Sequence, residues 1–280
     1  MNGNIIEKEE IRLEERQLKM VAGGWSADAI EKADVHKIVY ESDGWKVRGY
    51  LATPKYEGRH PVVIWNRGGA GERGSIDEFT ARGAFGLMAS WGYVVVASMY
   101  RGSIEGEGRD EFGGADVNDV LNLIPLAESL PQADAERMGM EGWSRGGLQT
   151  FRALARSDRF RCAVVSGGVA DLEDRVASVD KLRDYIADYL DPNDAPALRK
   201  RSPLRFVDRF PEDVAYLVVH GAHDEIVAPR KSLELATKML ERGLSLRYVL
   251  FDGGDHFLKK HRKEFDSIRK RWFDKHLKNV

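Results

Sequence analysis

The stretch that decides the fold runs from residue 137 to residue 155 and reads RMGMEGWSRGGLQTFRALA. Its first residues, 137–141, are typical of a short buried strand, and residues 148–155 are good helix formers. Between them, Gly142-Trp143-Ser144-Arg145-Gly146 has the form Gly-x-Ser-x-Gly. Small residues at both ends allow a strand, a sharp turn and a helix to approach closely, which exposes the serine hydroxyl. The stretch therefore predicts that Ser144 is a nucleophile.

Strands and helices alternate on both sides of this stretch. Eight strands are expected, at 36–41, 45–53, 61–65, 93–97, 138–141, 162–165, 216–219 and 246–251. Helices are expected between most of them, and Asp43-Gly44 predicts a hairpin between the first two strands. This order predicts an α/β domain over 36–280, with a mostly parallel eight-stranded sheet and helices on both faces. Residues 1–35 are expected to form a helical arm, and the polar, proline-containing segment 169–213 a small cap insertion.

A serine nucleophile needs a base, and the base needs an orienting acid. The strand at 216–219 ends in His220-Gly221-Ala222-His223-Asp224, and the strand at 246–251 is followed by Asp252-Gly253-Gly254-Asp255-His256. The carboxyl ends of parallel strands meet at one edge of the sheet, so Asp224 and His256 are predicted as acid and base. Asp255 competes for the acid role, but it directly precedes His256, so on an extended loop their side chains would point apart.

A metal site at the same loop is the other interpretation of His220, His223 and Asp224. No matching cluster of ligands accompanies them elsewhere in the sequence. We therefore expect neither a metal nor a cofactor.

The glycine-rich loop at 66–74 has two interpretations. A serine hydrolase needs two backbone N–H groups for the oxyanion, and Gly69 and Arg145 are the predicted donors. Alternatively, Gly69, Gly71 and Gly74 match a dinucleotide-binding fingerprint, but the next strand ends in Ser98 rather than in an acid.

Two further residues flank the predicted site and are candidates for substrate binding, namely Arg67 and Trp143. Trp143 could shape the acyl pocket or could pack against the sheet.

Composition excludes several classes of protein. The formal net charge is -2, with 43 Lys+Arg against 45 Asp+Glu, so nothing points to nucleic acid or to an anionic membrane. Cys162 is the single cysteine, which excludes an intrachain disulfide. The charged N-terminus does not resemble a signal peptide, and no apolar run reaches about 18 residues, so a cytoplasmic protein is expected. The arm, with its loosely helical apolar spacing, could mediate a homodimer.

Five motifs together resemble the catalytic domain of the prolyl oligopeptidase family (dipeptidyl and acylaminoacyl peptidases) and its small esterase-like relatives. They are Arg67-Gly68-Gly69, Arg101-Gly102-Ser103 with 112–116 and Asp119, Gly142 to Gly147, His220 to Val227, and Gly254-Asp255-His256. The resemblance runs from about Tyr40 to the end and implies an α/β-hydrolase fold with Ser144, Asp224 and His256 as the triad. Arg67 stands where family members often carry His or Tyr, so the chain would rely on backbone N–H groups for the oxyanion.

The resemblance implies a serine hydrolase that cleaves an ester or amide bond through an acyl-enzyme. Only about forty residues precede the match, which leaves no room for the β-propeller that filters substrates in the peptidases. A carboxylesterase-like enzyme is therefore expected, with a small acyl ester as substrate.

Three alternatives stay open. The first is an aminopeptidase or acylaminoacyl-type peptidase on short peptides, for which Glu173, Asp174 and Asp184 could bind a free amino terminus. The second is a Rossmann-type nucleotide-binding oxidoreductase. The third is a non-catalytic binding module on a hydrolase scaffold.

Overall fold

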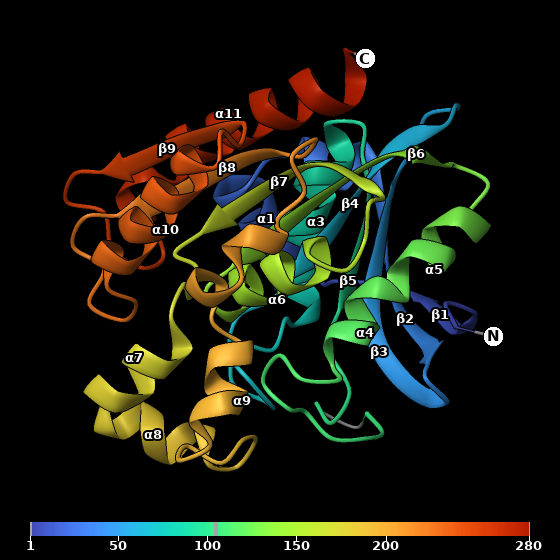
Figure 1. Ribbon diagram of the computed structural model, residues 1–280. Helices are drawn as coiled ribbons and strands as arrows, with labels where there is room; N and C mark the ends of the chain where they lie inside the picture. The colour runs from blue at the N-terminus through green and yellow to red at the C-terminus, as the bar shows by residue number, and fades with distance from the viewer. Residues whose placement is uncertain (1, 104–105, 280) are drawn as a thin grey trace.

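A nine-stranded sheet forms the centre of the computed structural model, which describes residues 2–103 and 106–279 (Figure 1). The strands are β1 (Ile5–Glu10), β2 (Ala33–Ser42), β3 (Trp45–Pro54), β4 (His60–Asn66), β5 (Val94–Ser98), β6 (Ala133–Trp143), β7 (Phe160–Ser166), β8 (Ala215–Gly221) and β9 (Leu246–Phe251). Their order is β1-β2-β3-β5-β4-β6-β7-β8-β9. The pairings from β5 through β4 to β9 are parallel, while β1, β2 and β3 pair antiparallel at one edge. The predicted α/β architecture and all eight expected strands are confirmed.

The ninth strand corrects the prediction for the N-terminal arm. Residues Ile5–Glu10 pair antiparallel with β2 and do not form a helix. Backbone hydrogen bonds to β2 hold this strand in place. Because it buries almost no side chain, its sequence lacks the apolar alternation from which a strand is predicted. Its charged, exposed residues are typical of a sheet edge that resists pairing with another chain. The ends of the predicted domains, residues 1 and 280, lie outside the described residues.

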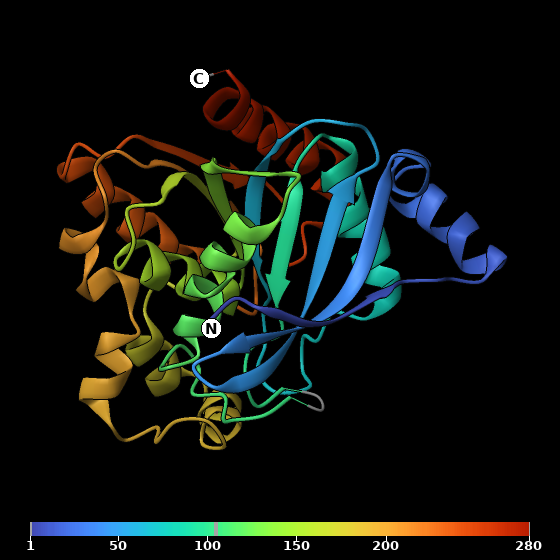
Figure 2. The ribbon, with the colours of Figure 1, turned by 90° about the vertical axis from the view of Figure 1, so that its right-hand side faces the viewer.

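Helices cover both faces of the sheet (Figures 1 and 2). The helices of the main body are α1 (Glu15–Gly24), α2 (Asp28–Glu31), α3 (Glu78–Ser90), α4 (Val117–Leu121), α5 (Leu123–Ser129), α6 (Arg145–Leu154), α10 (Pro229–Glu241) and α11 (Arg262–Phe273), with a π-helical turn at Asp274–Lys278. Helices α4, α5, α6 and α10 pack into the core on one face, and α3 and α11 into the core on the other. Helix α1 packs on α3 of its own chain through Val21 and Leu87. A homodimer through this arm stays a prediction.

The segment between β7 and β8 leaves the main body and forms a separate small layer (Figure 1). It holds α7 (Leu172–Ser178), α8 (Asp180–Ile186), α9 (Ala195–Lys200) and the 3-10 turns Pro203–Arg205 and Val207–Arg209. Its apolar side chains form their own core with Ala70, Phe112, Leu148 and Val227. Because those four residues follow the carboxyl ends of β4, β5, β6 and β8, the segment covers that edge of the sheet.

Among the helices of the described residues, none combines the length and the apolar character that crossing a bilayer would require.

Candidate active site

Ser144 lies at the sharp turn between β6 and α6, with φ 58° and ψ -121°. A positive φ is rare for a residue with a side chain and marks a strained turn. The turn is also tightly packed, because a Cβ at Gly146 would lie 2.0 Å from the Asn66 carbonyl oxygen. A Cβ at Gly142 would lie 2.2 Å from the Gly146 oxygen. The two glycines of the motif are therefore required by close backbone contacts.

Asp224 follows β8, and its carboxylate reaches the histidine that follows β9. Asp224 Oδ2 lies 2.7 Å from His256 Nδ1 and 3.1 Å from His220 Nε2. Its other oxygen, Oδ1, accepts from the N–H groups of Ile226 at 2.9 Å and Val227 at 2.8 Å. Asp255 instead accepts from the Lys259 N–H at 2.9 Å, so the structure brings Asp224 and not Asp255 to His256.

These contacts keep the Asp224 carboxylate ionised. Burial alone would raise the pKa of Asp224, but hydrogen bonds from His220, His256 and the Val227 N–H outweigh it and hold that pKa well below its ordinary value. An ionised Asp224 accepts a hydrogen bond from His256 Nδ1–H. The basic lone pair of the imidazole is then on Nε2, as proton transfer from a serine requires.

Ser144 and His256 line one cavity of about 520 Å³. Its walls are largely aromatic and aliphatic side chains, from Phe112, Trp143, Leu182, Tyr185, Ile226 and Phe257. Trp143 Nε1 donates to the His256 carbonyl oxygen at 3.1 Å, and the two ring centroids lie 5.1 Å apart. Trp143 therefore forms part of the cavity wall and also supports the histidine. The cap contributes Leu182 and Tyr185, so it closes the cavity on one side.

The glycine-rich loop lies directly against the serine. A Cβ at Gly68 would be 3.1 Å from Ser144 Cβ, and both Gly69 and Arg145 line the cavity. Arg145 is the first residue of α6, where N–H groups lack an intrahelical partner. Gly69 and Arg145 thus both lie where a backbone N–H group could act as an oxyanion donor, as proposed from the sequence. A dinucleotide fingerprint would run directly into a helix, whereas α3 begins only at Glu78, after an intervening loop.

The Arg67 side chain is not a substrate-binding group, which corrects the prediction. It is fully buried and does not line the cavity. A guanidinium has five N–H donors, and all of them are used by five acceptors: the carbonyl oxygens of Gly68, Gly71, Arg73 and Met99, and the Ser103 hydroxyl. Arg67 therefore holds the glycine-rich loop in shape from behind.

The Arg145 side chain also points into the protein. Its guanidinium lies 2.6 Å from Asp110 and 2.6 Å from Asp116, and it donates to the Gly69 carbonyl oxygen at 2.8 Å. Asp110 in turn accepts from the Gly71 N–H at 3.2 Å. Only the backbone of Arg145 is thus available to an oxyanion, while its side chain ties α6 to the loop that carries Gly69. Apart from the motif that contains Asp116, no sequence pattern predicted this network.

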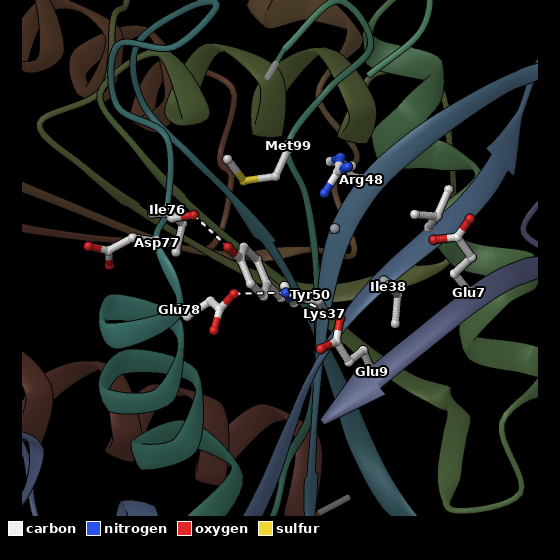
Figure 3. A pocket seen from close by; sticks show the side chains of 12 residues that line it. Glu7, Glu9, Lys37, Ile38, Arg48, Tyr50, Ile76, Asp77, Glu78 and Met99 are labelled. Carbon is white, nitrogen blue, oxygen red and sulfur yellow. Dashed lines mark hydrogen bonds and ion pairs between the residues drawn. The ribbon is translucent and has the colours of Figure 1, made fainter. Parts of the chain in front are cut away.

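A second cavity, of about 390 Å³, lies near the antiparallel edge of the sheet (Figure 3). Lys37 lies between two carboxylates there, 2.8 Å from Glu78 and 3.2 Å from Glu9. Tyr50 donates to the Ile76 carbonyl oxygen at 2.6 Å. No residue of the predicted triad lines this cavity. The cavity at Ser144 is therefore the candidate active site.

The fold and the site define an α/β-hydrolase. Residues 79–280 match the prolyl oligopeptidase family, to which the chain belongs. The predicted resemblance is confirmed.

Two curated relatives come from Bacillus subtilis (strain 168). The uncharacterized peptidase YtmA is 29% identical over 209 residues, which cover 73% of this chain and 79% of the relative. The uncharacterized peptidase YuxL is 26% identical, and the match covers 84% of this chain but only 38% of the relative.

Solved structures share the fold. An acylaminoacyl peptidase in complex with Z-Gly-Gly-Phe-chloromethyl ketone has a TM-score of 0.74 at 25% identity, covering 88% of this chain and 42% of that chain. An acylaminoacyl peptidase of Pyrococcus horikoshii has a TM-score of 0.76 at 24% identity, covering 89% and 43%. The chain thus spans less than half the length of these structures and of YuxL.

Proposed function

We propose that this chain is a serine peptidase that cleaves short peptides through an acyl-enzyme. The observation that carries the proposal is the 2.7 Å contact between Asp224 and His256, with His256 and Ser144 lining one cavity. The apolar cavity walls favour a substrate with an aromatic or aliphatic side chain beside the scissile bond.

In the proposed reaction, His256 Nε2 accepts the Ser144 proton while the serine oxygen attacks the substrate carbonyl carbon. The N–H groups of Gly69 and Arg145 stabilise the oxyanion of the tetrahedral intermediate. His256 then gives its proton to the leaving amine as the C–N bond breaks. A water molecule, deprotonated by His256, attacks the acyl carbon, and His256 returns that proton to Ser144 Oγ as the acyl C–O bond breaks and the acid leaves.

The names of the relatives favour the peptidase alternative over the carboxylesterase expected from sequence, because they are called peptidases. The test is a matched pair of substrates, N-acetyl-phenylalanyl-alaninamide and N-acetyl-phenylalanine methyl ester. We expect the protein to release alaninamide from the first, and we expect this activity to disappear in Ser144→Ala. Turnover of the ester without any turnover of the peptide would support a carboxylesterase and contradict the peptidase.

A further inference from the structure

Besides His256, the charged side chains that line the candidate active-site cavity in the described part of the chain are all arginines. Among the described residues, its lining contains Arg73, Arg145, Arg175 and His256 but no Asp or Glu. Arg145 is neutralised by Asp110 and Asp116. Arg73 and Arg175 are therefore the lining arginines that form no ion pair with another described residue.

Arg175 on α7 has most of its donors unused. Its Nη2 donates to the Ile226 carbonyl oxygen at 2.9 Å, and its Nε is buried without a hydrogen-bond partner. Asp224 is close enough to act on the pKa of Arg175, in the direction that raises it, but that carboxylate already accepts from four donors. Burial lowers the pKa of Arg175 and outweighs the opposing effect of Asp224, yet a guanidinium stays protonated in proteins. Arg175 is thus a partly desolvated cation that forms no ion pair with any carboxylate of the described chain.

Arg73, on the glycine-rich loop, approaches the cavity from the other side. Its guanidinium lies 4.8 Å from the ring centroid of Tyr185, and it too forms no ion pair among the described residues. Tyr185 is fixed by the Ala70 N–H, which donates to its hydroxyl at 2.5 Å. The aromatic ring therefore holds this cation beside the cavity.

The acidic residues of the cap do not offset these charges. Glu173 is paired with Arg199 at 2.8 Å, and Asp174 with Lys231 at 3.2 Å. Neither they nor Asp184 line the cavity. Within residues 2–103 and 106–279, the cavity lining thus offers no carboxylate to the free amino terminus of a peptide.

We propose that Arg175, assisted by Arg73, binds a carboxylate of the substrate close to the scissile bond. A desolvated guanidinium with free donors gains strongly from a charge-assisted hydrogen bond to an anion. The carboxylate can be the C-terminal one of a short peptide or that of an acidic side chain. This inference rests on the proposed peptidase function and makes anionic peptides the preferred substrates.

The test compares pairs of peptides that differ only in one carboxylate. One arm uses N-acetyl-Phe-Ala with a free C-terminus against the same peptide with a C-terminal amide. The other arm uses N-acetyl-Glu-Phe-Ala-amide against N-acetyl-Gln-Phe-Ala-amide. We expect kcat/KM to be about tenfold higher for the anionic member in at least one arm, which is the scale of one charge-assisted hydrogen bond. The arm that shows the preference identifies the source of the carboxylate.

Variants show whether Arg175 causes the preference. We expect Arg175→Gln to bring the ratio of the two kcat/KM values close to one, and Arg175→Lys to restore part of it. The control is Arg199→Gln, because Arg199 lies on the cap with its side chain 61% exposed and does not line the cavity. The readout is the ratio of two kcat/KM values measured on the same protein sample. A smaller fraction of folded protein lowers both values equally and leaves the ratio unchanged. Equal rates in both arms, or an unchanged ratio in Arg175→Gln, would overturn the inference.

A binding measurement separates this inference from the proposed function. Calorimetry on Ser144→Ala with the same peptide pairs needs no turnover, and we expect about tenfold tighter binding of the anionic member. Without turnover by the wild-type protein, such binding would support the carboxylate site and contradict the peptidase. Turnover of neutral peptides with no preference in rate or binding would support the peptidase and overturn the carboxylate site.

Discussion

Replacing Asp224 by Asn is expected to lower kcat/KM by about 10⁴-fold, the scale found when the acid of a serine triad loses its charge. The carboxylate accepts four hydrogen bonds in the structure, from two histidines and two backbone N–H groups. An amide offers only one acceptor oxygen and adds an NH₂ donor. If that NH₂ faces His256, it favours the imidazole tautomer whose proton is on Nε2, and this tautomer cannot accept the Ser144 proton.

Steady-state kinetics on a neutral peptide measure this effect, and Asp255→Asn is the matched control. Asp255 precedes the same histidine in the chain but accepts from the Lys259 N–H, away from His256. We expect that variant to retain activity within a few-fold of wild type. Equal losses in the two variants would mean that Asp224 has no special role and would contradict the assignment of the acid.

The second large effect is expected from Arg145→Leu, which should reduce the free energy of unfolding by about 3–5 kcal/mol. The substitution leaves Asp110 and Asp116 buried without their cation. It also removes the hydrogen bond to the Gly69 carbonyl oxygen, so we expect kcat to fall in the protein that remains folded. Urea denaturation followed by fluorescence measures the change in stability.

Arg159→Leu is the matched control for that measurement. The side chains of its ion pair with Glu128 are 36% and 41% exposed, and such pairs typically contribute less than about 1 kcal/mol. A change for Arg145→Leu as small as that of the control would show that the buried network does not stabilise the fold. Full activity in the folded Arg145→Leu protein would show that the Arg145 side chain does not position the glycine-rich loop.

Much of this architecture could be predicted because the decisive signals are local. Short β-branched runs such as 62–64 and 94–96 fit strands buried on both faces of a parallel sheet. The spacing of glycines around Ser144 reflects the close contacts that the turn requires. Asp224 and His256 lie in the loops that follow β8 and β9, so the topology alone brings them to the carboxyl-end edge of the sheet. Asp224 and His256 are therefore in contact, and His256 lines the same cavity as Ser144, which lies 112 positions earlier in the chain (256 − 144).

The errors arose where long-range partners decide the outcome. Strand β1 forms because β2 supplies hydrogen-bonding partners, which its own charged sequence does not reveal. Arg67 lies in the glycine-rich loop, but its side chain turns inward because it donates to acceptors as distant in sequence as Met99 and Ser103. The approach of Arg175 to the cavity depends on how the cap folds back over the sheet edge. Such contacts have no signature within a window of sequence.

The central claim, that Ser144 is an activated nucleophile, is tested most directly by labelling the protein with a fluorophosphonate and mapping the adduct by mass spectrometry. Fluorophosphonates react with serines that a neighbouring base activates. We expect one adduct per chain, located on Ser144, and none in Ser144→Ala or after unfolding. An unlabelled wild-type protein, or an adduct that persists in Ser144→Ala, would contradict it.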